Sequence, residues 1–372
     1  MVKHFDVCII CFNYISIDAR ALNLANALVD LNQKVAVISF DEVFDYEFRF
    51  QHYPIKIDKS RRLAVNLILF IKAYFTYSQK LTSNIIVSSD FYSLHVAYLF
   101  KKKFKSKLIY DSREIYSKLG KLDKERIKQK IISSIELLLV KRVDLLTVSG
   151  DLDSEYLKSY LPYKKEYYTI LNLPYYKPKV ESDLIRNYFK LPHSKKIILY
   201  QGILIKGRGI LTAISAISKL EDYVLVIIGE TSPYLDDIRK FAKLSQVEDR
   251  VYYKEKVDYT SLHEWTCSAD IGIALFEDIS LSYKYALPNK LFEYAMAGLP
   301  VIASDLPAMK LVTTGYNFVN YIEYPFDVNN LVIQIKLLTE NYDKFKKSAI
   351  QFAEKYNYEN QIDAIKKVFE VK

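Results

Sequence analysis

The sequence predicts an α/β protein made of two doubly wound domains. Its 372 residues exceed the usual size of a single hydrophobic core, and half of them are apolar, so each of two domains can bury its own core. Short β-rich apolar runs alternate with helical patterns along the chain, which is typical of parallel sheets covered by helices. The proline-bearing stretch Asn172–Pro178 separates two such series and is the predicted linker.

The first series predicts an N-terminal domain over residues 1–172. We expect its strands near Val7–Phe12, Lys34–Phe40, Ile85–Ser89, Lys107–Tyr110 and Leu145–Ser149. The run Leu63–Phe75 is too short and too polar to span a bilayer and predicts an amphipathic or core helix.

The second series predicts a C-terminal domain over residues 173–356. We expect its strands near Lys196–Tyr200, Val224–Ile228, Val251–Tyr253, Ile271–Leu275 and Val301–Ala303. The tail Asp343–Lys372 has a helical pattern that is interrupted around residues 356–359.

The net charge of +9 arises almost entirely in the first 172 residues, where 27 Lys and Arg face 19 Asp and Glu. Three interpretations remain open: a solvated face, a surface for anionic lipid headgroups, or a nucleic-acid footprint. No DNA- or RNA-binding motif accompanies the charge, so nucleic acid is the least favoured partner.

Three cysteines are too few for a disulfide framework and indicate a reducing compartment. Cys8 and Cys11 have C-x2-C spacing, but they lie in an apolar strand pattern and no second ligand pair follows. Buried packing is therefore favoured over a metal site. Asp6 precedes the first apolar run and no cleavage pattern is present, so we expect a cytoplasmic protein without a secretory signal.

The most informative stretch is Ala286–Ser304. Pro288 suits the first turn of a helix, Asn289 is a plausible cap, and Gly298 ends the helical pattern. The segment Val301–Ser304 is then a short β-branched strand of a parallel sheet. The free N–H groups of this helix should thus lie at a sheet edge, where phosphate binds well.

Within this stretch, the pattern Asn-Lys-x-Phe-Glu-x4-Gly-x-Pro-Val-Ile-Ala-Ser resembles the donor-site signature of glycosyltransferase family 4. The resemblance implies the GT-B fold, in which two Rossmann-like domains face each other across a cleft. In that family the second Glu of a Glu-x7-Glu pair binds the ribose hydroxyls of the donor nucleotide, which implies this role for Glu293. The first Glu of the pair would fall at position 285, which is Tyr285 in this chain. The C-terminal helix, about 357–372, would cross back onto the N-terminal domain.

A glycine-rich loop, Tyr200–Gly209, follows a predicted strand and opens a helix. It resembles the diphosphate loop of the family, with Arg208 at the position of the usual Lys. Ile203 stands at the position of the usual Arg, and Lys206 is the substitute we expect. A simple glycine-rich turn with exposed cations is the alternative. The resemblance implies a donor site formed by Gly202, Gly207, Glu277, Tyr285, Pro288, Asn289, Lys290, Leu291 and Glu293, with Arg208, Lys206, Glu293 and Arg113 as catalytic residues.

Polar residues of the N-terminal half follow predicted strands and should point to the edge where open α/β sheets bind ligands. The predicted acceptor-binding residues are Asp18, Arg20, Asp90 and Glu114. Arg113 stands where the family often has histidine, and it supplies a fixed cation instead of a titratable group. That Asp90 and Glu114 cap helices instead remains open.

The resemblance covers nearly the full chain and implies a retaining, metal-independent glycosyltransferase of the hexosyltransferase type, without a cofactor. It would move a sugar from a nucleotide-diphosphate sugar to an acceptor hydroxyl. The basic N-terminal half favours a lipid-linked glycan acceptor in surface polysaccharide synthesis, with peripheral contact at the inner face of the cell membrane. Two alternatives are a catalytically silent GT-B binding subunit, suggested by Tyr285, and a nucleotide-sugar epimerase.

Overall fold

The computed structural model describes residues 2–41, 47–58, 61–119, 122 and 125–371. They form two compact units, of which the first comprises Met1–Asn172 and Gln361–Lys372 and the second Leu173–Asn360. The chain thus leaves the first unit at residue 172 and rejoins it at Gln361, slightly later than the predicted residue 357.

The first unit is built on a seven-stranded sheet. Its strands are β1 (Lys3–Ile10), β2 (Val35–Phe40), β3 (Gln51–Ile55), β4 (Leu81–Ser88), β5 (Lys107–Ser112), β6 (Leu145–Val148) and β7 (Glu166–Thr169). They lie in the order β3-β2-β1-β4-β5-β6-β7, and every pair is parallel. β1 lies inside the sheet, with Val7 opposite Val35 on one side and Ile85 on the other.

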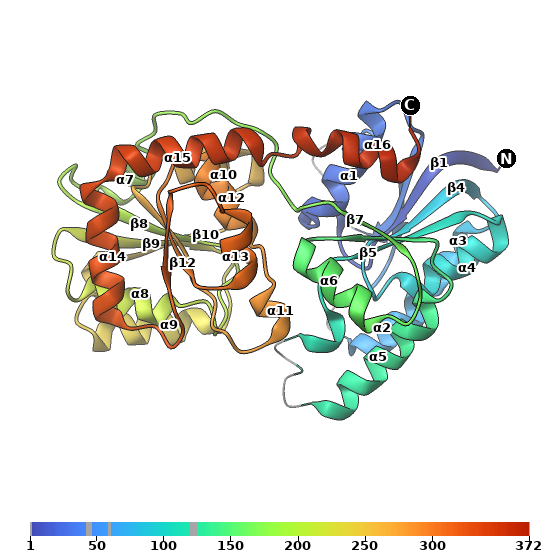
Figure 1. The fold of residues 1–372 in the computed structure, drawn as a ribbon, viewed down its shortest axis with the longest axis horizontal. Coiled ribbons are helices and arrows are strands. Elements are labelled where there is room, and N and C mark those ends of the chain that lie inside the picture. Colours follow the sequence, from blue (N-terminus) through green and yellow to red (C-terminus); the bar gives the residue numbers. More distant parts are fainter. Residues whose placement is uncertain (1, 42–46, 59–60, 120–121, 123–124, 372) are drawn as a thin grey trace. The chain divides into compact units, whose positions relative to one another are not determined.

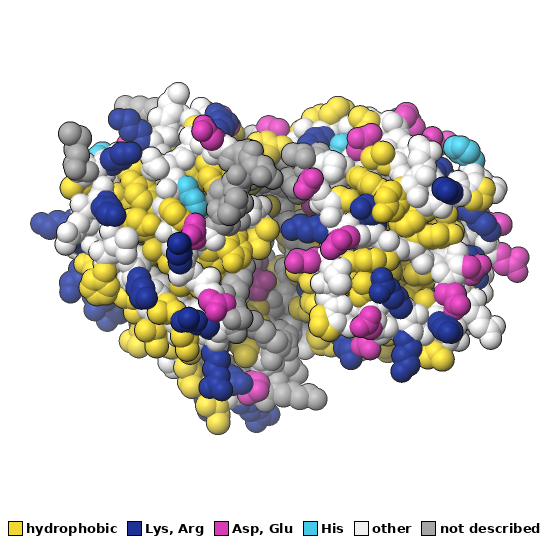
Figure 2. Space-filling model, turned by 180° about the vertical axis from the view of Figure 1, so that it is seen from behind, with side chains coloured by type: hydrophobic (Ala, Val, Ile, Leu, Met, Phe, Trp, Pro, Cys, Tyr) yellow, Lys and Arg dark blue, Asp and Glu magenta, His cyan; other side chains and the backbone are white. Residues whose placement is uncertain are grey.

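Helices cover both faces of this sheet (Figure 1), which explains why β2 is buried along its whole length. They are α1 (Ala19–Asp30), α2 (Leu63–Phe70), α3 (Lys72–Tyr77), α4 (Leu94–Phe104), α5 (Arg126–Val140), α6 (Asp151–Tyr160) and α16 (Ile362–Phe369), with 3-10 turns η1 (Ile15–Ile17) and η2 (Tyr116–Lys118). Hydrophobic and cationic side chains appear together on the lower left of Figure 2, where α5 lies.

The second unit is built on a six-stranded parallel sheet. Its strands are β8 (Lys196–Gln201), β9 (Tyr223–Gly229), β10 (Val251–Glu255), β11 (Ile271–Ala274), β12 (Val301–Ser304) and β13 (Val319–Ile322), in the order β10-β9-β8-β11-β12-β13. The helices are α7 (Leu184–Phe189), α8 (Ile210–Ile217), α9 (Tyr234–Leu244), α10 (Tyr259–Cys267), α11 (Leu281–Lys284), α12 (Asn289–Met296), α13 (Pro307–Val312), α14 (Val328–Glu340) and α15 (Tyr342–Lys355).

The predicted doubly wound α/β class is confirmed by these two sheets. Each sheet reverses its strand order once, between β1 and β4 in the first unit and between β8 and β11 in the second. In open α/β sheets, ligands bind beyond the carboxyl ends of the strands at such a reversal. The fold therefore predicts a ligand-binding site at the carboxyl edge of the sheet in each unit.

Three edge strands, β3, β7 and β13, were not predicted. β3 pairs only with β2 and carries polar residues and Pro54 in place of an apolar run. An edge strand of this kind is held by its neighbour in the sheet, so its own sequence carries little signal. The predicted helix over Leu63–Phe75 is instead two helices, α2 and α3, which meet at Ile71.

Candidate functional site

In the second unit, the loops after β8 and β11 meet at the carboxyl edge of the sheet. The backbone N–H of Glu277 donates a 3.0 Å hydrogen bond to the carbonyl of Gly207 and ties the two loops together. Gly209 has a φ of +65° and precedes α8, and a Cβ at this position would lie 2.4 Å from the Cβ of Leu275. Only glycine fits there, so close contact between the loops depends on it.

Two cations of this edge lie against aromatic rings. The Arg208 guanidinium is 4.0 Å from the ring centre of Phe276 and 4.7 Å from that of Tyr283. The Lys290 ammonium is 3.7 Å from the ring centre of Tyr200. Among the described residues, neither cation forms a salt bridge with a carboxylate. Their charge is therefore available to an anionic ligand.

Burial lowers the pKa of Lys290 well below its ordinary value, and the nearby positive charge of Arg208 lowers it further. A Cβ on Gly202 would lie 3.5 Å from the Lys290 ammonium, so this lysine lies directly beside the start of the glycine loop. An anion bound at the loop would stabilise the charged form of Lys290.

Lys206, which we expected to act with Arg208, lies elsewhere. Its ammonium is 3.6 Å from a carboxylate oxygen of Asp237 on α9, and its side chain is 81% exposed. The cation that approaches Arg208 is instead Lys290, which sequence reasoning placed in the donor site without a charge role. The reason is local: Lys206 is at the tip of the loop, where its long side chain turns to solvent.

Glu293 is held in place by a short chain of hydrogen bonds. The Gln201 side-chain amide donates to Glu293, and the Thr266 hydroxyl donates to the Gln201 carbonyl oxygen at 2.9 Å. Burial raises the pKa of Glu293, while the hydrogen bond from Gln201 and the charge of Lys290 oppose that rise. Gln201 was not predicted as a site residue. The sequence feature that could have indicated it is a polar side chain at the end of an otherwise apolar strand.

The remaining predicted donor residues surround these groups. Pro288 is the N-cap of α12, in an extended conformation, and Asn289 is the first helical residue, so the predicted Asn289 cap is wrong. The helix thus begins one residue earlier than a cap at Asn289 would give, and Pro288 lies just before its first turn instead of within it. Leu291 is buried in the core. Tyr285 follows α11, and its backbone N–H donates to the carbonyl of Leu281.

In the first unit, a pocket of about 380 Å³ lies beyond the carboxyl ends of β1, β4 and β5. We call it the N-terminal pocket; its lining residues are Phe12, Asn13, Asp18, Leu63, Asp90, Tyr92, Arg113, Glu114 and Tyr116. Four of the residues predicted for this half, Asp18, Asp90, Arg113 and Glu114, therefore lie together. Tyr92 and Tyr116 were not predicted, because exposed and buried tyrosines look alike in a sequence.

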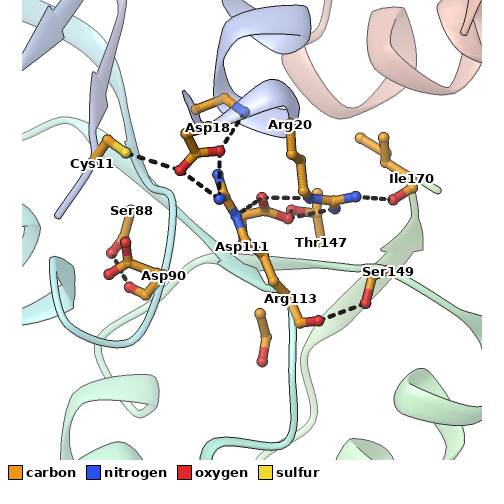
Figure 3. Close-up of polar contacts among 12 residues, drawn as sticks. Cys11, Asp18, Arg20, Ser88, Asp90, Asp111, Arg113, Thr147, Ser149 and Ile170 are labelled. Carbon is orange, nitrogen blue, oxygen red and sulfur yellow. Dashed lines mark hydrogen bonds and ion pairs between the residues drawn. The ribbon is translucent and has the colours of Figure 1, made fainter. Parts of the chain in front are cut away.

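Arg113 is the centre of a buried charge network (Figure 3). It donates from Nη1 to both carboxylate oxygens of Asp18, at 2.6 and 2.7 Å, and from Nε to Asp111 at 3.2 Å. Asp18 also accepts the backbone N–H of Ala21 at the start of α1 and the thiol of Cys11. Burial alone would raise the pKa of Asp18, but the charge and hydrogen bonds of Arg113, together with the hydrogen bonds from Ala21 and Cys11, lower it. The network is thus fixed in its ionised form.

One hydrogen-bond donor of this network has no acceptor among the described residues. Nη2 of Arg113 is buried and has no hydrogen-bond partner among the described residues. A buried donor without a hydrogen-bond partner is destabilising, so such donors usually bind a water molecule or a ligand. Arg113 also lines the N-terminal pocket. Its position suits contact with an oxygen atom of a bound molecule.

Arg20 does not line the N-terminal pocket. Its guanidinium forms a two-point ion pair with Asp111, with distances of 2.8 and 2.6 Å, and it also donates to the carbonyl of Ile170. Burial of both partners makes this a core contact of α1 with β5 and not an acceptor contact. Asp111 was not predicted, although a carboxylate in a buried strand was a usable signal.

Asp90 has a double role. Its carboxylate accepts backbone N–H groups from Ser93 at 2.7 Å, just before α4, and from Phe12 at 3.2 Å. Ser93 is the N-cap of α4, so Asp90 holds the turn before the helix instead of capping it, and it also lines the pocket. Burial raises the pKa of Asp90 to about 6, against the opposing charge of Arg113.

Among the described residues, no group of three His, Cys, Asp or Glu side chains is placed to hold a metal ion. Cys8, Cys11 and Cys267 are buried and free of disulfides. None of the described helices has the length and apolar character needed to cross a membrane.

The second unit resembles a known protein family. Residues 195–341 match the family model described as glycosyl transferases group 1. The match lies within the second unit and covers most of it. The match covers the glycine loop, both cations and Glu293, so the predicted family resemblance is confirmed where it was read from the sequence. No curated protein sequence matches the chain.

Solved structures extend the likeness to the whole chain. Sucrose-phosphate synthase from Thermosynechococcus elongatus aligns with a TM-score of 0.83 at 15% identity, covering 99% of this chain and 98% of that one. Anabaena HepE, solved with UDP and glucose, aligns at 0.76 and 12% identity over 99% and 100%. WaaG, a glycosyltransferase involved in lipopolysaccharide biosynthesis, aligns at 0.69 and 15% over 97% and 99%. The two-domain GT-B fold of these proteins is thus the fold of this chain.

Proposed function

We propose that this protein transfers a sugar from a nucleoside-diphosphate sugar to an acceptor hydroxyl, with the donor held by the second unit. The observation that carries the proposal is the pair Arg208 and Lys290 beside the glycine loop. Both cations lie against aromatic rings instead of carboxylates, and the loop opens α8. A helix start and two cations that form no salt bridge among the described residues together suit a diphosphate.

The chemistry needs such a site because the departing nucleoside diphosphate develops negative charge. Fixed cations and backbone N–H groups stabilise that charge without rearranging during the reaction. Arg208 and Lys290 supply this stabilisation in the proposal, and no metal ion is required. Glu293, oriented by Gln201, accepts hydrogen bonds from the ribose hydroxyls.

The proposed acceptor site is the N-terminal pocket. Carboxylates and aromatic rings are the groups that commonly bind sugars, and the pocket brings Asp90, Glu114, Tyr92 and Tyr116 together. The unpartnered Nη2 of Arg113 would donate to an oxygen of a substrate. We propose a lipid-linked glycan as acceptor, and retention of the anomeric configuration, with the leaving phosphate taking the acceptor proton.

A binding experiment tests the donor site first. UDP, GDP, ADP and CMP, each alone and as a sugar conjugate, are titrated by calorimetry with and without EDTA. UDP is the first to test, because HepE was solved with UDP and glucose. We expect micromolar binding of one nucleoside diphosphate that survives EDTA, weakened at least about tenfold in Arg208→Ala and in Glu293→Gln. The matched control Lys206→Ala should bind normally.

The outcomes separate the alternatives. Binding followed by release of free sugar or transfer to an acceptor supports the proposal, and NMR of the product then reports the anomer. Tight binding without any turnover would favour the silent binding subunit that Tyr285 suggests. Conversion of the sugar without an acceptor would favour an epimerase. Failure to bind any of the four nucleotides would overturn the donor site.

A further inference from the structure

Helix α5 of the first unit has apolar side chains on two opposite faces. Ile132, Leu137 and Leu139 pack against the hydrophobic core, as amphipathic helices normally do. The opposite face carries a second apolar row, with exposed fractions between 43 and 76%: Ile127, Ile131, Ile135 and Leu138. The spacing of four, four and three residues places this row on one side of the helix. Large apolar groups in water on this scale indicate a surface that something else covers.

The charges around this row are predominantly positive, although Lys128 pairs with the exposed Glu125 just before the helix at 3.0 Å. Arg126, Lys128 and Lys130 lie at the start of α5, and Lys141 and Arg142 follow its end. The sole acidic residue between positions 126 and 142 is Glu136, which is buried and accepts a hydrogen bond from the Tyr110 hydroxyl. The solvent side of α5 is thus apolar in the middle and cationic at both ends.

Helices α2 and α3 repeat the same combination. Leu63, Val65, Ile68 and Phe75 are between 41 and 71% exposed. Arg61, Arg62 and Lys72 lie among them on the surface. No acidic residue occurs from position 61 to position 77, and the exposed Asp58 just before this segment pairs with Arg61 at 3.5 Å. A basic helix pair with exposed aliphatic and aromatic side chains is the composition of helices that lie in a membrane interface.

Both surfaces adjoin the N-terminal pocket. Leu63, at the start of α2, lines the pocket, and so does Tyr116 of η2. α5 packs directly against η2. Figure 2 shows the yellow and dark blue side chains of this lower part of the unit intermixed. The start of α2 therefore lines the pocket, and α5 reaches it through η2.

We propose that the first unit docks on an anionic lipid bilayer through a docking surface formed by the exposed apolar residues of α2, α3 and α5 and their flanking cations. The acceptor would then reach the N-terminal pocket from the bilayer, which makes it a lipid-linked molecule. This last step rests on the proposed function, whereas the docking itself does not. Phospholipid headgroups match the cations, and the apolar rows insert between them.

A second copy of the chain is a weaker match for this surface. In a twofold dimer the same residues face one another, so the cations of one copy would meet those of the other. Anionic lipid removes that repulsion and adds counter-charge at every cation. The excess of positive charge thus argues for a membrane and against self-association.

Vesicle flotation of the full chain tests the docking surface. Vesicles of phosphatidylcholine alone are compared with vesicles of phosphatidylcholine and phosphatidylglycerol, at low and high salt. We expect flotation with the anionic vesicles, reduced by salt. The pairs Ile131→Gln with Leu138→Gln, and Ile68→Gln with Phe75→Gln, should each lower the bound fraction at least about fivefold. The matched control Leu244→Gln, at a position 72% exposed on the second unit, should float like the parent.

Three results would overturn the proposal: no flotation of the parent protein, equal flotation with neutral and anionic vesicles, or loss of a dimer in the variants with unchanged flotation. Unfolding temperature and nucleotide binding are measured on the same samples, and the exposed Gln substitutions should change neither. Flotation without nucleotide binding would contradict the proposed function and support the docking surface. Nucleotide binding without flotation would support the proposed function and contradict the docking surface.

Discussion

The two sheet edges that carry the candidate sites hold their cations in opposite ways. In the first unit, Arg113 and Arg20 are each paired with buried carboxylates, Asp18 and Asp111. In the second unit, Arg208 and Lys290 lie on aromatic rings and pair with no described carboxylate. Both edges follow the same strand-order reversal, so topology alone does not account for the difference.

The different pairing of these cations indicates a different role for each sheet edge. A buried ion pair is neutral as a whole and stabilises the local structure, provided that both partners are present. A buried cation without a counter-ion is costly, and a protein retains it where a ligand supplies the missing charge. The first edge is therefore a rigid, neutral frame with one spare donor, whereas the second is an incomplete site for an anion.

Replacing one cation by methionine in each unit tests this difference most directly, and the larger effect is expected in the first unit. Arg20→Met removes the two-point partner of Asp111 and leaves this buried carboxylate only the Arg113 contact at 3.2 Å and the Thr147 hydroxyl, which should lower the free energy of unfolding by about 3 kcal/mol. Urea denaturation measures it. The control Arg49→Met breaks an exposed pair with Asp30 and should cost less than about 1 kcal/mol. Equal effects of the two substitutions would contradict the buried-frame interpretation.

The neutral character of the first edge has one exception at Asp90, whose buried carboxyl has a pKa of about 6 instead of 3.8. Because the folded protein holds this proton more tightly than the unfolded chain, the residue stabilises the fold below pH 4, and that contribution is lost as the pH rises through 6. Asp90→Asn removes this dependence. Relative to the parent, the variant should gain on the order of 3 kcal/mol between pH 4 and pH 7. Unfolding curves at both pH values measure it; parallel changes in the two proteins would refute it.

Lys290→Met is the counterpart of the Arg20 change in the second unit. Losing a buried cation that pairs with no described carboxylate should leave the free energy of unfolding within about 1 kcal/mol of the parent, or raise it. Nucleoside-diphosphate affinity should fall about 10- to 100-fold, the value of a lost charged contact. Calorimetry and denaturation on the same preparation measure both. Strong destabilisation with intact binding would reverse our assignment.

Lys206→Met should have the smallest effect of the set. Its ion pair with Asp237 is exposed, so unfolding free energy should change by less than about 0.5 kcal/mol. Nucleotide affinity should stay within about threefold of the parent, since the side chain points away from the cation pair. A large loss of affinity would restore the role that its position in the loop first suggested.

Much of the fold was determined by the sequence itself. Strands buried on both faces, such as β2 and β9, are continuous apolar runs, and helices that cover them have periodic apolar faces. Positions that only glycine can occupy, such as that of Gly209, indicate a loop regardless of the residues around them. These signals are local, and they predicted the doubly wound class, the glycine loop and the start of α8.

Only the tertiary structure decided how charged and apolar side chains are used. Arg20 and Asp111 are 91 positions apart and meet because α1 packs on β5, and Lys290 approaches the loop at Gly202 from another helix. The outer row of α5 looks like core in the sequence and is exposed in the structure. Local sequence specifies a conformation, whereas the partner of a charge and the cover of an apolar row depend on residues brought together from distant parts of the chain.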